Sequence, residues 1–250
     1  MIDILRERWK QGYRTGAFPK QEPALPDRFR GLPVIRQEQC PPDCGQCQGQ
    51  CPFDAVMATA EGVGIDLGRC LFCGDCMVCP HGCIAFSQDY RLATRTREDL
   101  HLGRDELQLA AALKGRMKAL FGRSLKLRQV SAGGCNACEA DINVLGTLVF
   151  DLGRFGIQFV ASPRHADGIL VTGPVTKNMR AALLATYEAM PAPKLVIAAG
   201  ACAIAGGPFR DSPETTGGIN DLLPVDLFIP GCPPHPYTTL DGLLRLLDRR

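Results

Sequence analysis

The sequence predicts an α/β protein in which a small, cysteine-rich α+β domain precedes a larger domain built on a parallel sheet. Two observations lead to this prediction. Nine of the thirteen cysteines fall between Cys40 and Cys83, in two runs that repeat each other. Beyond residue 125, short apolar runs alternate with helical stretches, which is typical of parallel strands that helices cover on both faces.

The composition indicates a globular protein without a global charge bias. With 250 residues, 46% hydrophobic and 22% charged, the chain is long enough for one large or two small domains with real cores. A net charge of +2 does not favour nucleic acid, so we expect no nucleic-acid partner. No apolar run approaches the eighteen residues that a membrane span needs. Any link to a membrane must therefore be through a partner.

Residues 1–36 are expected to form an extended arm. The arm opens with a short amphipathic segment in which Ile2, Leu5 and Trp9 share one face, and four prolines follow among charged residues. Such a segment would bury little against its own chain. It therefore either lies along a partner or is a free tail.

Residues 37–92 form the predicted cysteine-rich domain. Its two runs read Cys40-x3-Cys44-x2-Cys47-x3-Cys51-Pro52 and Cys70-x2-Cys73-x2-Cys76-x2-Cys79-Pro80. Both are near copies of the C-x2-C-x2-C-x3-C-P run that holds 4Fe-4S clusters in bacterial ferredoxins. Strand-like residues at 32–35 and 63–66 precede the runs, so each half is predicted as a strand, a cluster loop and a short helix.

The spacing also predicts which cysteines share a cluster. In two-cluster ferredoxins, the cysteine before the proline ligates the other cluster. The two predicted ligand sets are therefore Cys40, Cys44, Cys47 and Cys79, which we call the first site, and Cys51, Cys70, Cys73 and Cys76, which we call the second site.

Both runs depart by one residue from the usual spacing, so the register of the second run has two readings. Superposing the residues that follow each Cys-Pro step places Cys83 where the first repeat has Ala55, a small buried side chain. A rival register uses Cys73, Cys76, Cys79 and Cys83 and leaves Cys70 without a role. The internal repeat favours the first register.

Disulfides and zinc are the alternatives for these cysteines. The first residues of the chain are charged and lack the apolar core of a secretory signal, which argues against an oxidising compartment. Zinc sites need four ligands at paired spacings, whereas two runs of four cysteines, each closed by proline, fit clusters better.

Residues 93–125 are expected to be a linker that contains a basic amphipathic helix starting near Arg104. Its apolar residues recur at helical spacing: Ala110, Leu113, Met117, Leu120 and Phe121. Its other side is basic: Lys114, Arg116, Lys118, Arg123, Lys126 and Arg128. That side is either a solvated face or a docking surface for an acidic partner or anionic headgroups.

Residues 126–250 form the predicted parallel-sheet domain. We expect strands at 127–130, 157–161, 168–172, 195–199 and 226–229, and helices at 139–152, 177–190 and 240–247. The remaining cysteines each follow a predicted strand: Cys135, Cys138, Cys202 and Cys232. Because ligands bind beyond the carboxyl ends of strands in open α/β sheets, these thiols should converge. The glycines around them would let the backbone approach a bulky cofactor, so this third site predicts another 4Fe-4S cluster.

Three segments around these cysteines carry a family resemblance. They are Gly134-Cys135-Asn136-Ala137-Cys138-Glu139, Gly200-Ala201-Cys202-Ala203-Ile204-Ala205-Gly206-Gly207 and Pro230-Gly231-Cys232-Pro233-Pro234-His235-Pro236. Together with residues 171–176, they closely resemble the small subunits of group 4 (energy-converting) nickel-iron hydrogenases, including formate hydrogenlyase. These are related to the quinone-proximal 20 kDa cluster subunit of respiratory complex I. Residues 27–33 and the two cysteine runs look like the ferredoxin-type subunit of the same complexes.

The resemblance implies a flavodoxin-like second domain fused behind a ferredoxin-like one. Complex I subunits have two adjacent cysteines at the first ligand position, whereas this chain has Cys135-x2-Cys138 as hydrogenase small subunits do. That difference argues against a quinone site. Glu139 matches an acidic family position near the large-subunit interface, where a proton path is one reading and a helix-start carboxylate is the more economical one.

The function that the resemblance implies is that of a non-catalytic electron-transfer subunit of an oxidoreductase, with three 4Fe-4S clusters. The third site would lie beside the nickel-iron centre of a separate large subunit. The first two would exchange electrons with a ferredoxin or a formate dehydrogenase-type partner. The resemblance also implies a cytoplasmic protein that is peripheral on the cytoplasmic membrane through partner subunits, with membrane subunits completing the complex. A complex I-related oxidoreductase whose large subunit lacks nickel is the alternative, and a zinc-binding interaction module is a third reading from another class.

Overall fold

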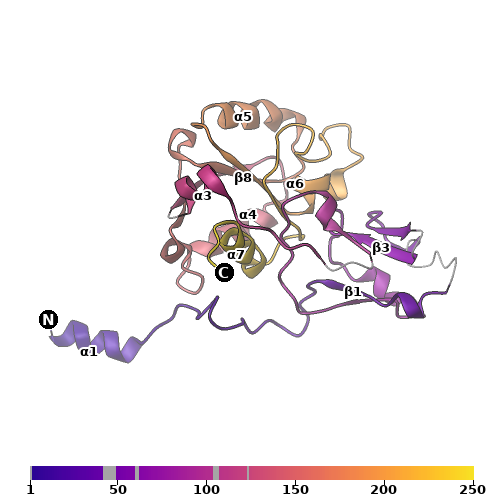
Figure 1. Cartoon of the computed structure of the whole chain (residues 1–250), viewed down its shortest axis with the longest axis horizontal. Helices are drawn as coiled ribbons and strands as arrows, with labels where there is room; N and C mark the ends of the chain where they lie inside the picture. Colours follow the sequence, from indigo (N-terminus) through magenta and orange to yellow (C-terminus); the bar gives the residue numbers. More distant parts are fainter. Residues whose placement is uncertain (1, 42–48, 60–61, 104–106, 123) are drawn as a thin grey trace.

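The structure, a computed structural model of the chain, describes all residues except 1, 42–48, 60–61, 104–106 and 123. A larger domain holds a parallel sheet with helices on both sides, and a smaller region of short strands lies beside it (Figure 1). The N-terminal helix stands apart from both. The predicted ligands Cys44 and Cys47, and the expected helix start at Arg104, lie outside the described residues.

The larger domain contains the parallel sheet that the sequence predicts. Its five strands are β6 (Leu125–Ser131), β7 (Ile157–Phe159), β8 (Gly168–Thr172), β9 (Leu195–Ala199) and β10 (Leu227–Ile229). Their order is β10-β9-β8-β6-β7, and every neighbouring pair is parallel. All residues of β8 and β9 are buried. The α/β fold class is therefore confirmed for this domain.

Helices cover both faces of this sheet. They are α4 (Ala137–Asn143), α5 (Lys177–Glu188), α6 (Ala201–Ala205) and α7 (Pro236–Leu246). Side chains of β8 alternate between two apolar clusters: Ile169 packs on the face with Leu183 of α5, and Leu170 packs on the face with Leu243 of α7. The two cores therefore lie on opposite faces of one sheet, as the period of a strand requires.

All three predicted helices of this domain have different limits in the structure, and the one expected at 177–190 ends two residues early, at Glu188. The helix expected at 139–152 ends at Asn143 and continues as 3-10 turns, η4 (Val144–Gly146) and η5 (Leu152–Phe155). Thr147 explains part of this, because its Oγ1 donates to the Val144 carbonyl at 2.7 Å and competes with the helical pattern. Helix α7 begins at Pro236 rather than Leu240, since His235 Nδ1 accepts from the amide of Tyr237 and caps the first turn.

The cysteine-rich region consists of two small antiparallel sheets. In one, β1 (Pro33–Ile35) pairs with β4 (Ile84–Phe86); in the other, β3 (Gly62–Asp66) pairs with β2 (Val56–Thr59) and β5 (His101–Leu102). Strands β1 and β3 precede the two runs as expected, whereas β2 and β4 follow them and were not predicted. Short 3-10 helices occur at η1 (Gln37–Gln39), η2 (Asp75–Val78) and η3 (Glu98–Leu100).

The helix expected to start near Arg104 is wrong over residues 107–114. The observed helix, α3, spans only Gly115–Phe121. Before it, the amide of Ala110 donates to the Ala93 carbonyl and that of Leu113 to the Leu246 carbonyl, so both are engaged outside any helix. Gly115 has φ +54°, which interrupts a right-handed helix. The apolar spacing reflects burial of Ala110, Leu113 and Phe121 in the core, not one continuous helix.

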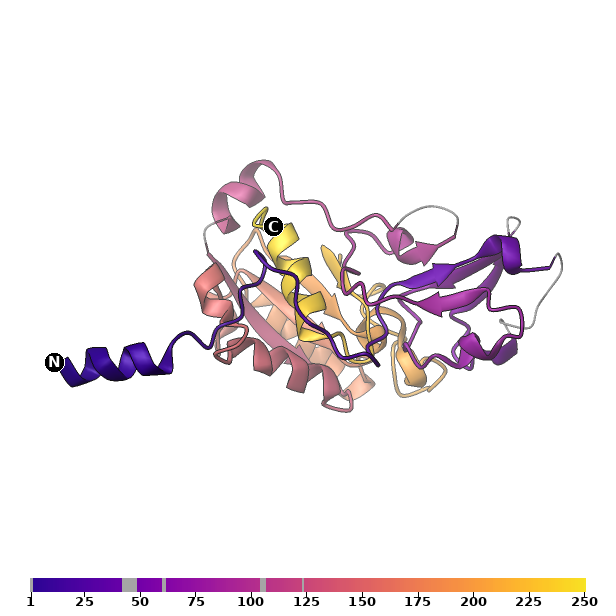
Figure 2. The ribbon, with the colours of Figure 1, turned by 90° about the horizontal axis from the view of Figure 1, so that it is seen from below.

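The arm divides into a free helix and a packed segment. Helix α1 (Ile2–Gln11) has no buried residue and projects away from the body (Figure 2). In contrast, Phe18 is 4% exposed and packs against the rings of Tyr90 and Tyr237. The expectation that the arm buries little against its own chain is thus wrong for this part, because an aromatic cluster receives it. Among the described residues, no helix has both the length and the apolar character that crossing a bilayer requires.

Candidate metal centres

The strand ends of the parallel sheet bring four cysteines, far apart in sequence, to one small pocket. This third site contains every cysteine that the sequence predicted for it: Cys135 after β6, Cys138 in α4, Cys202 in α6 and Cys232 after β10. Cys202 is buried, Cys138 is half-buried, and Cys135 and Cys232 are exposed. The pocket thus opens to the surface on the side of the two exposed thiols.

Glycines make room for the sulfur atoms of this site. Gly200 has φ +91°, and a Cβ atom there would lie 2.6 Å from Cys138 Sγ. Gly207 has φ +52°, and a Cβ atom there would lie 2.8 Å from Cys202 Sγ. Any larger residue would therefore displace a thiol and also adopt an unfavourable backbone conformation. Four convergent thiols with backbone held clear of them are the donor set that a 4Fe-4S cluster uses.

Three thiols of the third site lie in surroundings that favour their neutral form. Burial raises the pKa of Cys202 to about 12 and shifts the pKa of Cys138 and Cys232 upward as well. Iron ligation requires thiolates, so metal binding here must release protons from these groups. The positive charge of the iron atoms would then stabilise the thiolates that burial alone disfavours.

Glu139 anchors the first turn of α4 beside this pocket. It is 7% exposed, and Thr172 Oγ1 at the end of β8 donates to its Oε1 at 2.5 Å. Burial raises the pKa of Glu139, but hydrogen bonds from Ser131 and Thr172 outweigh burial and lower it overall. The carboxylate therefore ties α4 to β6 and β8. Glu139 was a candidate from the sequence. Its hydrogen-bond partners lie on two other strands, so no sequence motif around Glu139 predicts them.

The second site also forms one small pocket. The cysteines that line it are those that the crossed ferredoxin pattern predicts: Cys51, Cys70, Cys73 and Cys76. Backbone amides already point at two of the sulfur atoms, because Ala55 N lies 3.3 Å from Cys51 Sγ and Phe72 N lies 3.4 Å from Cys70 Sγ. Such hydrogen bonds to sulfur are among the features that set cluster potentials.

Burial raises the pKa of two thiols in the second site, as it does in the third. It raises the pKa of Cys70 to about 12 and that of Cys76 to about 11. Cys73 is exposed and Cys51 is half-buried. This pocket therefore presents fewer exposed thiols than the third.

The first site is only partly described. Cys83 contacts the thiols of Cys40 and Cys79, and burial raises its pKa to about 12. Cys83 is fully buried immediately before β4, as Ala55 is before β2, which is the equivalence expected from the repeat. The rival ligand set is divided in the structure, since Cys73 and Cys76 line the second pocket whereas Cys83 lies with Cys40 and Cys79. The ligand assignments at all three sites remain predictions.

The described residues offer no place for a single metal ion. In the described part of the chain, no group of three or more His, Cys, Asp or Glu side chains could hold one ion. A mononuclear zinc site needs sulfur atoms about 2.3 Å from one centre. A four-iron cluster is larger and accepts more widely spaced thiols.

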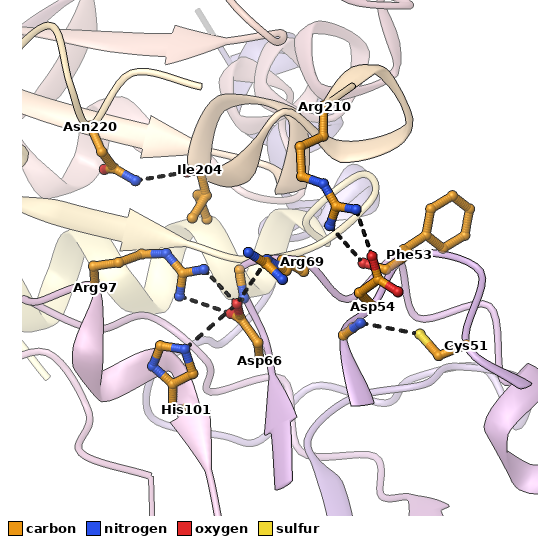
Figure 3. Close-up of polar contacts among 12 residues, drawn as sticks. Cys51, Phe53, Asp54, Asp66, Arg69, Arg97, His101, Ile204, Arg210 and Asn220 are labelled. Atoms are coloured by element: carbon orange, nitrogen blue, oxygen red, sulfur yellow. Dashed lines mark hydrogen bonds and ion pairs between the residues drawn. The ribbon is translucent and has the colours of Figure 1, made fainter. Parts of the chain in front are cut away.

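Polar contacts that the sequence did not reveal hold the loops of the second site, and those of Arg210 also connect them to the segment that carries Cys202 (Figure 3). Asp66, 2% exposed, accepts from Arg97 at 2.8 and 2.5 Å and lies 3.5 Å from Arg69. Its Oδ1 also accepts from the amide of Gly68, two residues before Cys70. Arg210 contacts the segment after Cys51. These contacts join residues up to 157 positions apart, which no motif encodes.

Comparisons with known proteins match the part of the chain that carries the third site. Residues 135–246 match the family described as NADH ubiquinone oxidoreductase, 20 Kd subunit. A probable membrane-bound hydrogenase subunit of Pyrococcus furiosus is 44% identical over 129 residues, which cover 52% of this chain and 77% of the relative. Formate hydrogenlyase subunit 7 of Escherichia coli is 44% identical over 143 residues, 56% of each chain.

A third relative comes from a respiratory enzyme. A subunit of the NADH-quinone oxidoreductase of Citrifermentans bemidjiense is 49% identical over 116 residues, which cover 46% of this chain and 68% of the relative. By their names, the relatives are subunits of oxidoreductase complexes. The family match begins at Cys135 and so does not extend over the two cysteine runs.

Proposed function

The chain belongs to the family of the 20 kDa subunit of NADH ubiquinone oxidoreductase, and on this premise we propose that it is an iron–sulfur electron-transfer subunit of a membrane-associated group 4 nickel-iron hydrogenase or formate hydrogenlyase-like complex. It relays electrons between the active site of a large subunit and a redox partner through three 4Fe-4S clusters. The observation that supports this most directly is the convergence of four cysteines, within the matched region, in one pocket at the strand ends.

The third site is the end of the relay that faces the large subunit. Its four thiolates hold a cluster that accepts and donates single electrons, while Gly200 and Gly207 leave space for two of the sulfur atoms. Cys135 and Cys232 are exposed, so a docking subunit would cover this end of the pocket. The chain itself contributes no catalytic residue in this proposal.

The cysteine-rich region is the end of the relay that faces the outside donor or acceptor. In this proposal, residues 37–92 form a ferredoxin-type domain with the first and second sites, and residues 93–125 link it to the domain of residues 126–250. The pocket lined by Cys51, Cys70, Cys73 and Cys76 supports the ligand set of the second site. The partner is a ferredoxin or a formate dehydrogenase-type protein, and membrane subunits hold the complex on the cytoplasmic side.

A second candidate is a complex I-related oxidoreductase whose large subunit lacks nickel. The NADH-quinone oxidoreductase relative supports this alternative. The Cys135-x2-Cys138 spacing favours the hydrogenase type. Both functions need the same three clusters in this chain.

Metal analysis of the full chain, produced without oxygen and reconstituted with iron and sulfide, tests the proposal. We expect about twelve irons with matching sulfide per chain. Replacement of Cys232 by Ala should remove the signal of one cluster in electron paramagnetic resonance and leave the other two. Stoichiometric zinc in place of iron would overturn the proposal, and so would an unchanged set of signals in Cys232→Ala.

Assembly with the partner subunits distinguishes the two candidates. Co-purification with the large subunit should yield a complex that reduces a dye with hydrogen. Nickel in the large subunit is expected for the hydrogenase. An intact complex with all its clusters but without nickel or hydrogen-dependent dye reduction would favour the complex I-related alternative.

A further inference from the structure

Arg210 joins a loop of the second site to the turn that follows the third-site ligand Cys202. Its Nη1 donates to the carbonyl of Phe53 at 3.2 Å, and its Nη2 donates to Asp54 Oδ2 at 2.6 Å (Figure 3). Phe53 and Asp54 follow Cys51 by two and three residues. Arg210 also lies within 3.4 Å of its neighbour Asp211, but that contact stays on its own segment.

The turn between Cys202 and Arg210 is tightly packed. It consists of the end of α6, Gly206 and η7 (Gly207–Phe209). Gly206 has φ +79°, and a Cβ atom there would lie 2.7 Å from Arg210 Cα. At Gly207, a Cβ atom would lie 2.8 Å from Cys202 Sγ. The position of Arg210 is therefore closely tied to that of the Cys202 sulfur.

The loop that Arg210 contacts is equally compact. The amide of Asp54 lies 3.4 Å from the Cys51 carbonyl, and that of Ala55 lies 3.3 Å from Cys51 Sγ. Asp54 has φ +51°, so this turn is sharply bent. A shift of the Phe53 carbonyl would consequently move the Cys51 sulfur.

A second contact fixes the other loop of the same pocket. The backbone of Gly68 lies against Ile204 of α6, because a Cβ atom at Gly68 would come within 2.8 Å of Ile204 Cγ2. Asp66 holds this segment through the amide of Gly68 and through Arg97. Both loops that supply the second pocket with cysteines thus touch the segment 201–210, which carries Cys202.

We propose that Arg210 is a positioning residue that sets the alignment of the second site with the third and thereby controls electron transfer between them. This inference rests on the proposed function. One electron passes between the two sites, so one centre is oxidised by one electron as the other is reduced by one, and no bond or proton moves. A low-potential one-electron reductant, dithionite in the test, supplies the electron.

The test compares three variants of the full, reconstituted chain. Arg210→Met removes both contacts at similar side-chain length, Arg210→Lys keeps the charge with fewer donors, and Asp54→Asn removes only the ion pair. The matched control is Arg180→Met, which alters an exposed arginine of α5. The measurements are iron content, the magnetic splitting between the dithionite-reduced second and third centres, and hydrogen exchange of residues 53–55.

Arg210→Met should keep the wild-type iron content and show a weaker magnetic splitting between the second and third centres. Its residues 53–55 should exchange hydrogen about tenfold faster, because loss of one charge-assisted contact shifts the opening equilibrium by about that factor. Arg210→Lys should retain part of the splitting, and Asp54→Asn should change less than Arg210→Met because the carbonyl contact remains. If Arg210→Met does not fold, the other two variants carry the measurement. Full iron content with wild-type splitting and exchange in all three variants would overturn this inference alone, whereas a wild-type chain without iron would overturn the proposed function with it.

Discussion

Single glycines decide where the sulfur atoms of the third site can lie. Gly200, the residue before α6, has φ +91°, and a Cβ atom there would lie only 2.6 Å from Cys138 Sγ. A methyl group there can be accommodated only if the thiol or the backbone moves. Backbone strain of this kind costs about 1–3 kcal/mol.

Gly200→Ala should therefore lower the free energy of unfolding by about 1–3 kcal/mol and weaken or abolish the signal of the third cluster. Thermal or denaturant unfolding and electron paramagnetic resonance measure the two effects. Gly146→Ala is the matched control, since Gly146 has no atom within 4 Å of an added Cβ and no positive φ. A normal third-cluster signal in Gly200→Ala would contradict the fit of this pocket to a cluster.

The two cysteines at the end of the second run should differ in function although they touch. Cys83 is buried where the first repeat has Ala55, so Cys83→Ala should keep the signals of both ferredoxin-type clusters. The substitution deletes one buried atom and should cost about 1 kcal/mol of stability. Cys79→Ala should lose or convert one signal, because Cys79 is the predicted crossed ligand of the first site. The opposite pattern in resonance spectra would establish the rival register.

At the scale of elements, the N-terminal arm is attached to the rest of the chain by a polar contact of Glu22 as well as by the packing of Phe18. Tyr90 Oη donates to Glu22 Oε2 at 2.6 Å, and Arg250 Nη2 lies 3.3 Å from Glu22 Oε1. The hydrogen bond from Tyr90 lowers the pKa of Glu22 below its usual 4.5, and Arg250 lowers it further. The first and last parts of the chain are thus joined by one carboxylate.

The attachment of the arm should consequently depend on pH. A carboxyl group whose pKa is lower in the folded state contributes stability that is fully present above its unfolded pKa and is lost as the pH falls through the folded pKa. Opening of residues 16–22 should become easier below about pH 4.5. The effect should be small, about 0.5 kcal/mol, because Glu22 is largely exposed.

Hydrogen exchange of the arm, corrected for its intrinsic pH dependence, measures this opening. In Glu22→Gln, residues 16–22 should open as readily at neutral pH as they do in the acidified wild type. The exchange rate of these residues should also change less with pH than in the wild type. Glu7→Gln on α1 is the matched control, because Glu7 lies on a helix without buried residues. Equal pH profiles for Glu22→Gln and the wild type would refute a role for this carboxylate.

Elements whose pattern reflects local burial could be predicted from the sequence. Strands β8 and β9 appear at the predicted residues because a fully buried parallel strand reads as a continuous apolar run. The stretch from Ala110 to Phe121 follows long-range contacts instead. Its helical spacing is real, but the amides of Ala110 and Leu113 bond to distant carbonyls, so tertiary contacts override the periodicity.

At the scale of the whole molecule, convergence of the third-site cysteines could be predicted from topology alone. A parallel sheet places the carboxyl ends of its strands at one edge, and Cys135, Cys202 and Cys232 each follow a strand. The contact between the two cysteine-bearing regions could not be predicted. One apolar cluster includes Ile65 of β3 and Ile204 of α6, and only the folded chain brings them together.

The third pocket should be the more vulnerable of the two fully described sites in the isolated chain. Two of its four cysteines, Cys135 and Cys232, are exposed, whereas the second site has one exposed cysteine, Cys73. Pro233, next to Cys232, is exposed as well, so apolar surface borders the opening. A docked large subunit would cover this opening and exclude oxygen from it.

The reconstituted chain should accordingly lose the third cluster to air before the second. Resonance spectra and iron content, followed over time after exposure to air, measure the two losses separately. The complex with the large subunit is the control, and there the third cluster should persist at least as long as the second. If both clusters decay at one rate in the isolated chain, and docking changes neither rate, the exposed cysteines do not mark a docking face. The chain would then be better described as a free-standing electron carrier, because a relay that ends beneath a partner subunit needs that end covered.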